Sequence, residues 1–271
     1  MQPEKFETVT SGTFSTSAIR LKSAVRASAV HFFVSVLVAV CTAGLVFFLW
    51  YPWPFYEIVR GRELFWLVIS VDVVCGPLLT MVLWNPSKPR RELALDMGLI
   101  LLIQITALGY GLYSVTQARP VRLVFEVDRF RLISASEVEP QDLPSAVPHL
   151  RSLPWAGPSL IGIRESRSGE ETLRSIELSM AGQEPSMRPN WWQSYDDSRF
   201  AVQRRMKPLV GLRAEKLPEA QAAIDGAVEK AGVPIGQIHY LPLVSHKSLD
   251  QWIALLDAEA NIIGYAPVGG F

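Results

Sequence analysis

Few side chains in this sequence have the types and the spacing that catalysis or metal binding requires. None of the four histidines pairs with another histidine or a cysteine at a metal-ligand spacing such as H-x-x-x-H. Ser245, His246 and Asp250 are residue types of a nucleophilic triad, but the strand–elbow–helix pattern that exposes a catalytic serine is missing. The sequence also lacks a phosphate-binding loop and a dinucleotide-binding fingerprint. We therefore expect no catalytic residues, no cofactor and no metal ion.

Asp72 is the chemically unusual group, because it lies near the middle of an apolar run over residues 64–84 and is followed by Pro77. A carboxylate within hydrocarbon costs about 2.5–3.5 kcal/mol on insertion scales, so it normally faces protein rather than lipid. Gln104 lies in the middle of a later apolar run and offers an amide partner. Two interpretations stay open for Asp72, Gln104 and Pro77: they dock a partner helix, or they brace the protein's own helices. A proton relay is disfavoured, because no basic partner and no ladder of acids accompanies Asp72.

The elements that position these groups are three apolar runs, at 29–50, 64–84 and 93–117. Runs of about 20 residues match a hydrocarbon core about 30 Å thick. We therefore predict a membrane protein with three transmembrane α-helices in region 28–119, followed by a small extramembrane α/β (α+β) domain at 120–271. Residues 1–27 are rich in serine and threonine and show no periodicity, which predicts a disordered cytoplasmic tail rather than a cleaved signal peptide.

The basic residues predict the orientation. The N-terminal tail and the loop after the second run together hold seven Lys and Arg, against two in the loop after the first run. Positive charge stays on the cytoplasmic side, so the N-terminus is expected inside and the C-terminal domain outside. Aromatic residues crowd the end of the first run, as they do at headgroup depth.

Composition excludes some partners of the C-terminal domain. Residues 1–120 hold 10 Lys and Arg against 7 Asp and Glu, and residues 121–271 hold 16 against 19, so neither part is basic enough to indicate nucleic-acid binding. Cys41 and Cys75 both lie in predicted spans, which leaves the domain without a disulfide or a cysteine metal site.

Periodicity within the domain predicts mixed α and β structure. A capping box at Ser168 and Glu171 opens a helix that Gly182 closes, and Pro218 opens the clearest helix, at 218–231. A further helix is expected at 196–206. Short apolar runs predict strands, the last two of which form a hairpin: 121–127, 237–244, 251–257 and 261–268. Strands near both ends of the domain, with helices between them, indicate one small sheet covered by helices.

Several blocks of this sequence resemble the TfpX/TfpZ family of type IV pilin accessory proteins, from about residue 28 to 267. The blocks are FFLWYPWPFYEI, VDVVCGPLLTMVLWNPSK, ALGYGLYSVTQARPVRLVFEVDRF, LPWAGPSLIG, SYDDSRFAVQRRMKPL and YLPLVSHKSLDQWIALLD. The resemblance implies a multi-pass protein of the bacterial inner membrane with a periplasmic domain. It implies a non-enzymatic, chaperone-like role in pilin stability or pilus assembly, with the major type IV pilin, other pilus assembly proteins and membrane lipid as partners. No catalytic residue comes with it.

Two other functions remain as alternatives. A membrane-anchored periplasmic hydrolase would gather two or more titratable groups within hydrogen-bond reach in a pocket of the domain. A small transporter subunit would need more polar lining than Asp72 and Gln104 provide.

Overall fold

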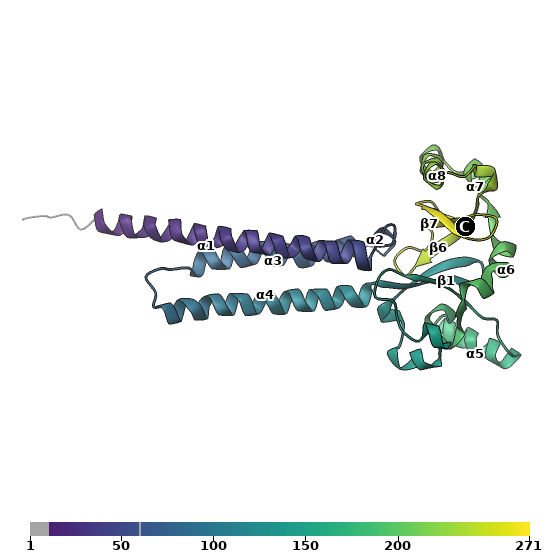
Figure 1. The fold of residues 1–271 in the computed structure, drawn as a ribbon, viewed down its shortest axis with the longest axis horizontal. Coiled ribbons are helices and arrows are strands. Elements are labelled where there is room, and N and C mark those ends of the chain that lie inside the picture. The colour runs from purple at the N-terminus through teal and green to yellow at the C-terminus, as the bar shows by residue number, and fades with distance from the viewer. Residues whose placement is uncertain (1–10, 60) are drawn as a thin grey trace, which may run out of the picture. The chain divides into compact units, whose positions relative to one another are not determined.

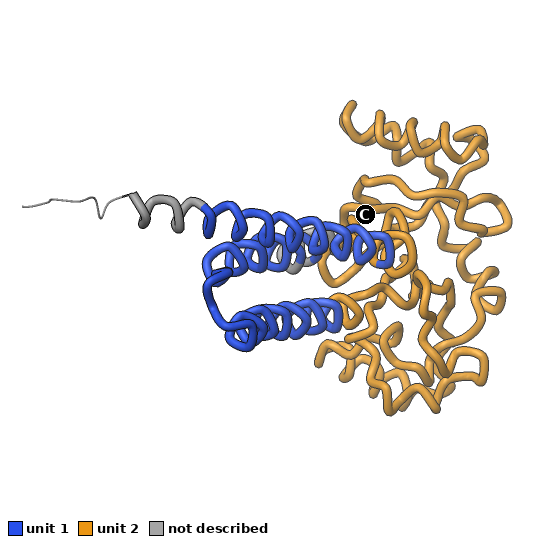
Figure 2. Tube along the Cα trace, turned by 60° about the vertical axis from the view of Figure 1, so that its left-hand side comes forward, with its two compact units in different colours: residues 1–45, 63–114 blue, residues 46–62, 115–271 orange. Residues whose placement is uncertain are grey.

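The apolar runs of the sequence form long helices in the computed structural model, which describes residues 11–59 and 61–271. Helix α1 (Ser11–Gly44) continues into a π-helical turn (Leu45–Trp50), and α3 (Gly61–Leu83) and α4 (Arg90–Ala118) follow. These three long helices lie side by side in both views (Figures 1 and 2). Helix α1 begins at Ser11, so residues 11–27 are helical where no regular structure was predicted, and residues 1–10 lie outside the described part.

The prediction of three transmembrane helices is wrong in its count. Among the described residues, two helices are long and apolar enough to cross a membrane, Ile19–Trp50 and Arg90–Ala118. The side chains of residues 61–64, 67 and 68 lie outside the described part. Among the described residues, α3 contributes only a shorter apolar stretch, Ile69–Leu83. At 1.5 Å per residue this stretch is about 22 Å long, short of a hydrocarbon core of about 30 Å. The fold is therefore two candidate spans with a shorter apolar helix between them, followed by a mixed-sheet domain.

The chain divides into two compact units, coloured separately in Figure 2. The helical unit comprises Met1–Leu45 and Glu63–Ser114, and the sheet unit comprises Val46–Arg62 and Val115–Phe271. The segment that follows the first candidate span thus groups with the C-terminal domain and not with the helices. Its single short helix, α2, covers Phe55–Ile58.

One mixed sheet organises the sheet unit (Figure 1). Its strand order is β4-β3-β1-β2-β6-β7-β8, with β5 paired to β6. β1 runs parallel to β3 and β2 runs parallel to β6, whereas the other pairs are antiparallel. The predicted hairpin near the C-terminus is confirmed, with Ala254 opposite Tyr265 in β7 and β8. The strands are β1 (Pro120–Glu126), β2 (Arg129–Ser134), β3 (Ser159–Ile163), β4 (Trp192–Ser194), β5 (Lys207–Pro208), β6 (His239–Ser245), β7 (Trp252–Leu256) and β8 (Ile262–Ala266).

Three helices of the sheet unit, at 169–180, 195–205 and 218–231, lie where local signals predict them, whereas the helix at 209–215 was not predicted. Ser168 accepts a hydrogen bond from the Glu171 amide at 3.2 Å and so caps α5. Pro218 occupies the first turn of α8, and Gly232 ends that helix in the left-handed conformation (φ 66°). The helices are α5 (Gly169–Met180), α6 (Tyr195–Arg205), α7 (Leu209–Glu215) and α8 (Pro218–Ala231), and 3-10 turns cover Ala135–Glu137, Pro140–Ser145, Pro148–Leu150, Pro185–Met187, Pro189–Trp191 and Ile235–Gln237.

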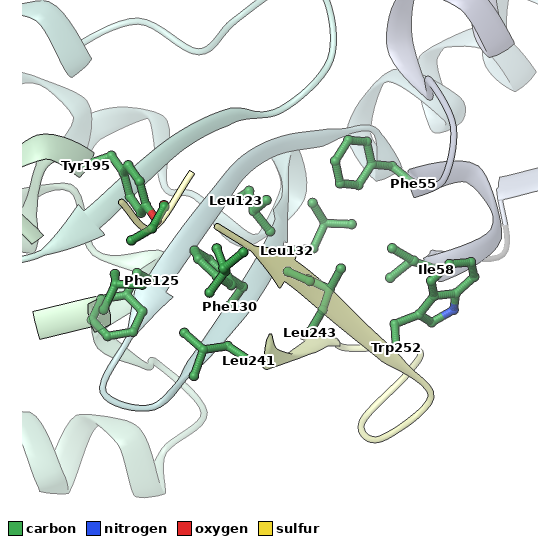
Figure 3. Packing of buried hydrophobic residues seen from close by; sticks show 14 residues of the cluster. Phe55, Ile58, Leu123, Phe125, Phe130, Leu132, Tyr195, Leu241, Leu243 and Trp252 are labelled. Carbon is green, nitrogen blue, oxygen red and sulfur yellow. The ribbon is translucent and has the colours of Figure 1, made fainter. Parts of the chain in front are cut away.

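The main core of the sheet unit includes residues from far apart in the sequence (Figure 3). Phe55 and Ile58 of α2 pack with residues of the sheet such as Leu132 and Trp252. Ile58 has no exposed surface. Burying a side chain of this size contributes about 1.5–3 kcal/mol, so α2 is part of the folding unit and not a free loop.

Candidate functional site

Asp72 and Gln104, the two polar groups of the apolar runs, meet inside the helical unit. Gln104 reaches from α4 to α3, where its Nε2 donates to Asp72 Oδ1 and to the Asp72 backbone oxygen, each at 3.1 Å. Asp72 is only 8% exposed. Gly76 permits this approach, because a Cβ at that position would overlap the Gln104 amide. The pair therefore links α3 to α4.

Pro77 belongs to a second polar contact, between α1 and α3. Its carbonyl oxygen accepts a hydrogen bond from Ser28 Oγ at 2.8 Å. One turn further along both helices, His31 Nδ1 and Thr80 Oγ1 share a hydrogen bond of 2.6 Å. Ser28 and His31 were not predicted as site residues, although their three-residue spacing puts both on one helix face. Polar side chains of all three long helices thus pair with one another.

The ends of the two candidate spans are joined within the sheet unit. The Tyr51 hydroxyl, one residue past Trp50, donates to the Val115 carbonyl in the last turn of α4 at 2.7 Å. Tyr51 is 1% exposed, and its burial raises the pKa of the phenol above the ordinary range. The Gly157 amide donates to the Leu49 carbonyl at 2.8 Å, which ties a loop of the domain to the same place. The last residues of both candidate spans therefore belong to the sheet unit.

The triad residue types near the C-terminus have structural bonding partners. Ser245 Oγ donates to the Ile58 carbonyl at 3.1 Å and accepts from the Ser248 amide at 3.0 Å. Asp250 Oδ1 accepts from the Gly270 amide at 2.7 Å. Ser245 thus fastens α2 to the sheet, and Asp250 holds the C-terminal residues. Neither bond prepares a nucleophile or a general base.

Two hollows beside β2 contain charged groups. One, of about 490 Å³, is lined by residues that include Val59, Leu132, Glu137 and His246. The other, of about 800 Å³, contains Arg131 and Glu184, which form an ion pair. An arginine stays protonated in proteins, so this pair holds charge and does not transfer a proton. Among the described residues, no group of three or more His, Cys, Asp or Glu is placed to hold a metal ion.

A strongly perturbed carboxylate, Glu171, lies on α5. Glu171 accepts two hydrogen bonds from the Arg164 guanidinium, at 2.6 and 3.1 Å, and one from the Arg167 amide at 2.6 Å. The Arg164 bonds, followed by the Arg167 amide, lower the pKa of Glu171 to about 2. These groups close the loop onto the start of the helix, which is a structural arrangement.

Fold and site together define a protein with two apolar candidate spans, polar contacts between its helices, and a mixed-sheet domain whose core includes the segment after the first span. Comparison with known proteins identifies a family model and relatives that match this chain. The family model described as fimbrial assembly protein FimB matches residues 19–60. The fimbrial assembly protein of serogroup I from Dichelobacter nodosus is 35% identical over 252 residues, which cover 93% of this chain and 98% of that protein.

Other relatives agree with this assignment. The serogroup E1 protein of the same organism is also 35% identical over 252 residues, and the protein of serogroups C1 and C2 is 44% identical over 127 residues, 47% of this chain and 97% of that protein. No solved structure matches the chain. Because the full-length similarity extends across both units, the chain belongs to the FimB family of fimbrial assembly proteins.

Proposed function

We propose that this protein is a membrane-anchored, non-enzymatic accessory factor in the assembly of type IV fimbriae, where it supports the stability or assembly of pilin. The observation that carries the proposal is the similarity to proteins named for fimbrial assembly along 93% of the chain, through both the helical and the sheet unit. The names of these relatives describe assembly and no reaction. The structural partners of Ser245 and Asp250 agree with such a role.

The proposed location is the bacterial inner membrane, with the N-terminus in the cytoplasm and the sheet unit in the periplasm. Large apolar side chains on the long helices are exposed, such as Phe33 (70%), Val82 (63%) and Leu102 (62%), as expected where lipid replaces water. The first candidate span ends at Trp50, which belongs to the sheet unit. The basic residues of the N-terminal tail favour the cytoplasm, so a span that ends at Trp50 supports a periplasmic location for the segment after it, which packs in the core of the sheet unit.

Reporter fusions test this orientation. An enzyme that is active only in the periplasm is expected to work when fused after Asn190 or Phe271, and to be silent when fused ahead of Met1. Silence at both C-terminal positions, with intact fusion proteins in the membrane fraction, would reject the periplasmic location.

The proposed partner is the major type IV pilin, which has one apolar helix below a globular head, together with other assembly proteins. A protein with both apolar helices and an extramembrane domain can contact both parts of such a partner. Contacts between helices in lipid depend on packing and polar bonds. Because Asp72 and Gln104 bond to each other, we assign them, with Pro77, to bracing the protein's own helices and not to docking pilin.

Deletion of the gene tests the proposed function. Cells that lack the protein are expected to carry few surface fimbriae, and expression of the full chain should restore them. Pilin transcript should stay unchanged, because the protein is proposed to act on pilin itself. Normal numbers of surface fimbriae in the deletion strain would reject the proposal.

A further inference from the structure

Trp155 is an exposed aromatic residue in a place that the domain's own folding does not explain. It lies in the loop between the 3-10 turn Pro148–Leu150 and β3, and 63% of its surface is exposed. Large aromatic side chains in soluble domains are normally buried for most of their surface. Its neighbours in space, and not those in sequence, indicate what covers it.

Both neighbours of Trp155 mark the ends of candidate spans. Its ring stands edge-on to the ring of Trp50, the last residue of the span Ile19–Trp50, with centroids 5.8 Å apart. The guanidinium of Arg119 lies 5.8 Å from the Trp155 ring centroid, and Arg119 directly follows the span Arg90–Ala118. Trp155 is therefore at the level at which both apolar helices end.

The loop is fastened at this level by its backbone. The Gly157 amide donates to the Leu49 carbonyl at 2.8 Å. Gly157 has a φ of 58°, and a Cβ there would lie 3.3 Å from Pro52 Cγ, so glycine suits both the conformation and the close approach. These contacts hold Trp155 beside the last residues of the spans, while most of its surface stays exposed.

A second exposed tryptophan repeats the arrangement. Trp53 follows Trp50 by three residues and is 51% exposed, and Lys230 Nζ lies 5.6 Å from its ring centroid. Tryptophan beside a basic residue is the composition of membrane interfaces, where the ring sits at headgroup depth and the cation meets anionic headgroups. Trp53 belongs to the aromatic run that the sequence predicts for this depth, whereas Trp155 is 37 residues beyond the second span's last residue, Ala118.

We propose that Trp155 and Trp53, with Arg119 and Lys230, form a membrane-surface contact by which the sheet unit rests on the lipid headgroups at the periplasmic end of the spans. The inference depends on the membrane anchoring contained in the proposed function. It adds that the domain is seated on the bilayer by its own residues and is not merely tethered to it. The occupant of this surface is the headgroup layer of the membrane in which the helices are inserted.

Spin-label depth measurements on the full chain in lipid nanodiscs test this contact. Cys41 and Cys75 are replaced by alanine, and single cysteines are introduced at the exposed positions Ala156, Leu102 and Met180. Labelling Ala156 leaves Trp155 in place. Collision with oxygen, which concentrates in hydrocarbon, is compared with collision with a water-soluble nickel chelate. Leu102 should report hydrocarbon, Met180 water, and Ala156 a value between them.

Trp155→Ser should then shift the Ala156 label toward the value at Met180, whereas Leu217→Ser, at another exposed apolar position of the domain (78%), should leave it unchanged. A hydrocarbon value at Leu102 together with a water value at Ala156 in the unsubstituted domain would overturn the inference and leave the proposed anchoring intact. A water value at Leu102 would instead overturn the membrane anchoring itself.

Discussion

Replacing Gly76 by alanine is expected to break the bonds between Gln104 and Asp72 without removing either residue. The new Cβ would lie 2.6 Å from Gln104 Cδ and 2.9 Å from its Oε1, closer than any real contact. The Gln104 amide is the end of a flexible side chain, so it can move away. Its movement loses the two hydrogen bonds of 3.1 Å that join α4 to α3.

The size of the effect follows from these two bonds. Hydrogen bonds between membrane helices average about 0.6 kcal/mol and reach about 1.7 kcal/mol, so Gly76→Ala should lose about 1–3 kcal/mol of unfolding free energy. Alanine also favours a helix over glycine by about 1 kcal/mol, which partly offsets this loss. Gly109→Ala is the matched control, because it gains the same helix preference in α4 and its Cβ meets nothing within 4 Å.

The assay is denaturant unfolding of the full chain in mild detergent, followed by far-ultraviolet circular dichroism. Gly76→Ala should be less stable than Gly109→Ala by about 1–3 kcal/mol. In a Gln104→Ala background the difference should disappear, because the clash and the bonds are then both absent. Equal stability of the two glycine variants in the wild-type background would show that Gln104 does not bond to Asp72.

Three other changes test the sheet unit. Gly157→Ala should cost more stability than Gly232→Ala. Both glycines have a positive φ (58° and 66°), but only at Gly157 would the added Cβ contact a neighbouring side chain. Equal shifts of the melting temperature would contradict this. Arg164 lowers the pKa of Glu171 to about 2. The stability that this ion pair contributes is therefore present above about pH 4.5 and is lost as the pH falls toward 2. Glu171→Gln should flatten the acid limb of the stability profile over that range, and an unchanged limb would refute the pairing. Ser245→Ala should lower the melting temperature, because the variant loses about 1–3 kcal/mol of unfolding free energy. An unchanged melting temperature would contradict a structural role for the bond from Ser245 to Ile58.

Local signals predicted α5, α6 and α8 of the sheet unit but not α7. Pro218 and Gly232 fix the two ends of α8, and the structure gives that helix the predicted bounds. The β1–β2 hairpin escaped prediction because its turn has no typical turn sequence. Val127, a β-branched residue, has a φ of 60° there, where glycine or asparagine is expected. The parallel pairings of β1 with β3 and β2 with β6 join distant segments, which local patterns do not reveal.

The candidate site was predictable in its residue types and not in its long-range contacts. Asp72 and Gln104 were recognisable because polar groups in apolar runs need partners, and the structure brings them together. The count of three spans was wrong because, among the described residues, α3 contributes only the apolar stretch Ile69–Leu83, which is shorter than either candidate span. The contact of Trp155 with Trp50 links positions that are separated by α2, α3, α4 and the β1–β2 hairpin, and no periodicity indicates it.

Recovery of pilin with this protein from native membranes tests the central claim most directly. The full chain, tagged after Phe271, is extracted in mild detergent from fimbriated cells, with and without brief crosslinking. An unrelated tagged inner-membrane protein of similar abundance serves as the control. The proposed function predicts that the major pilin is enriched well above the control in both preparations. Pilin at the control level in both, with the tagged protein intact and the cells still fimbriated, would contradict it.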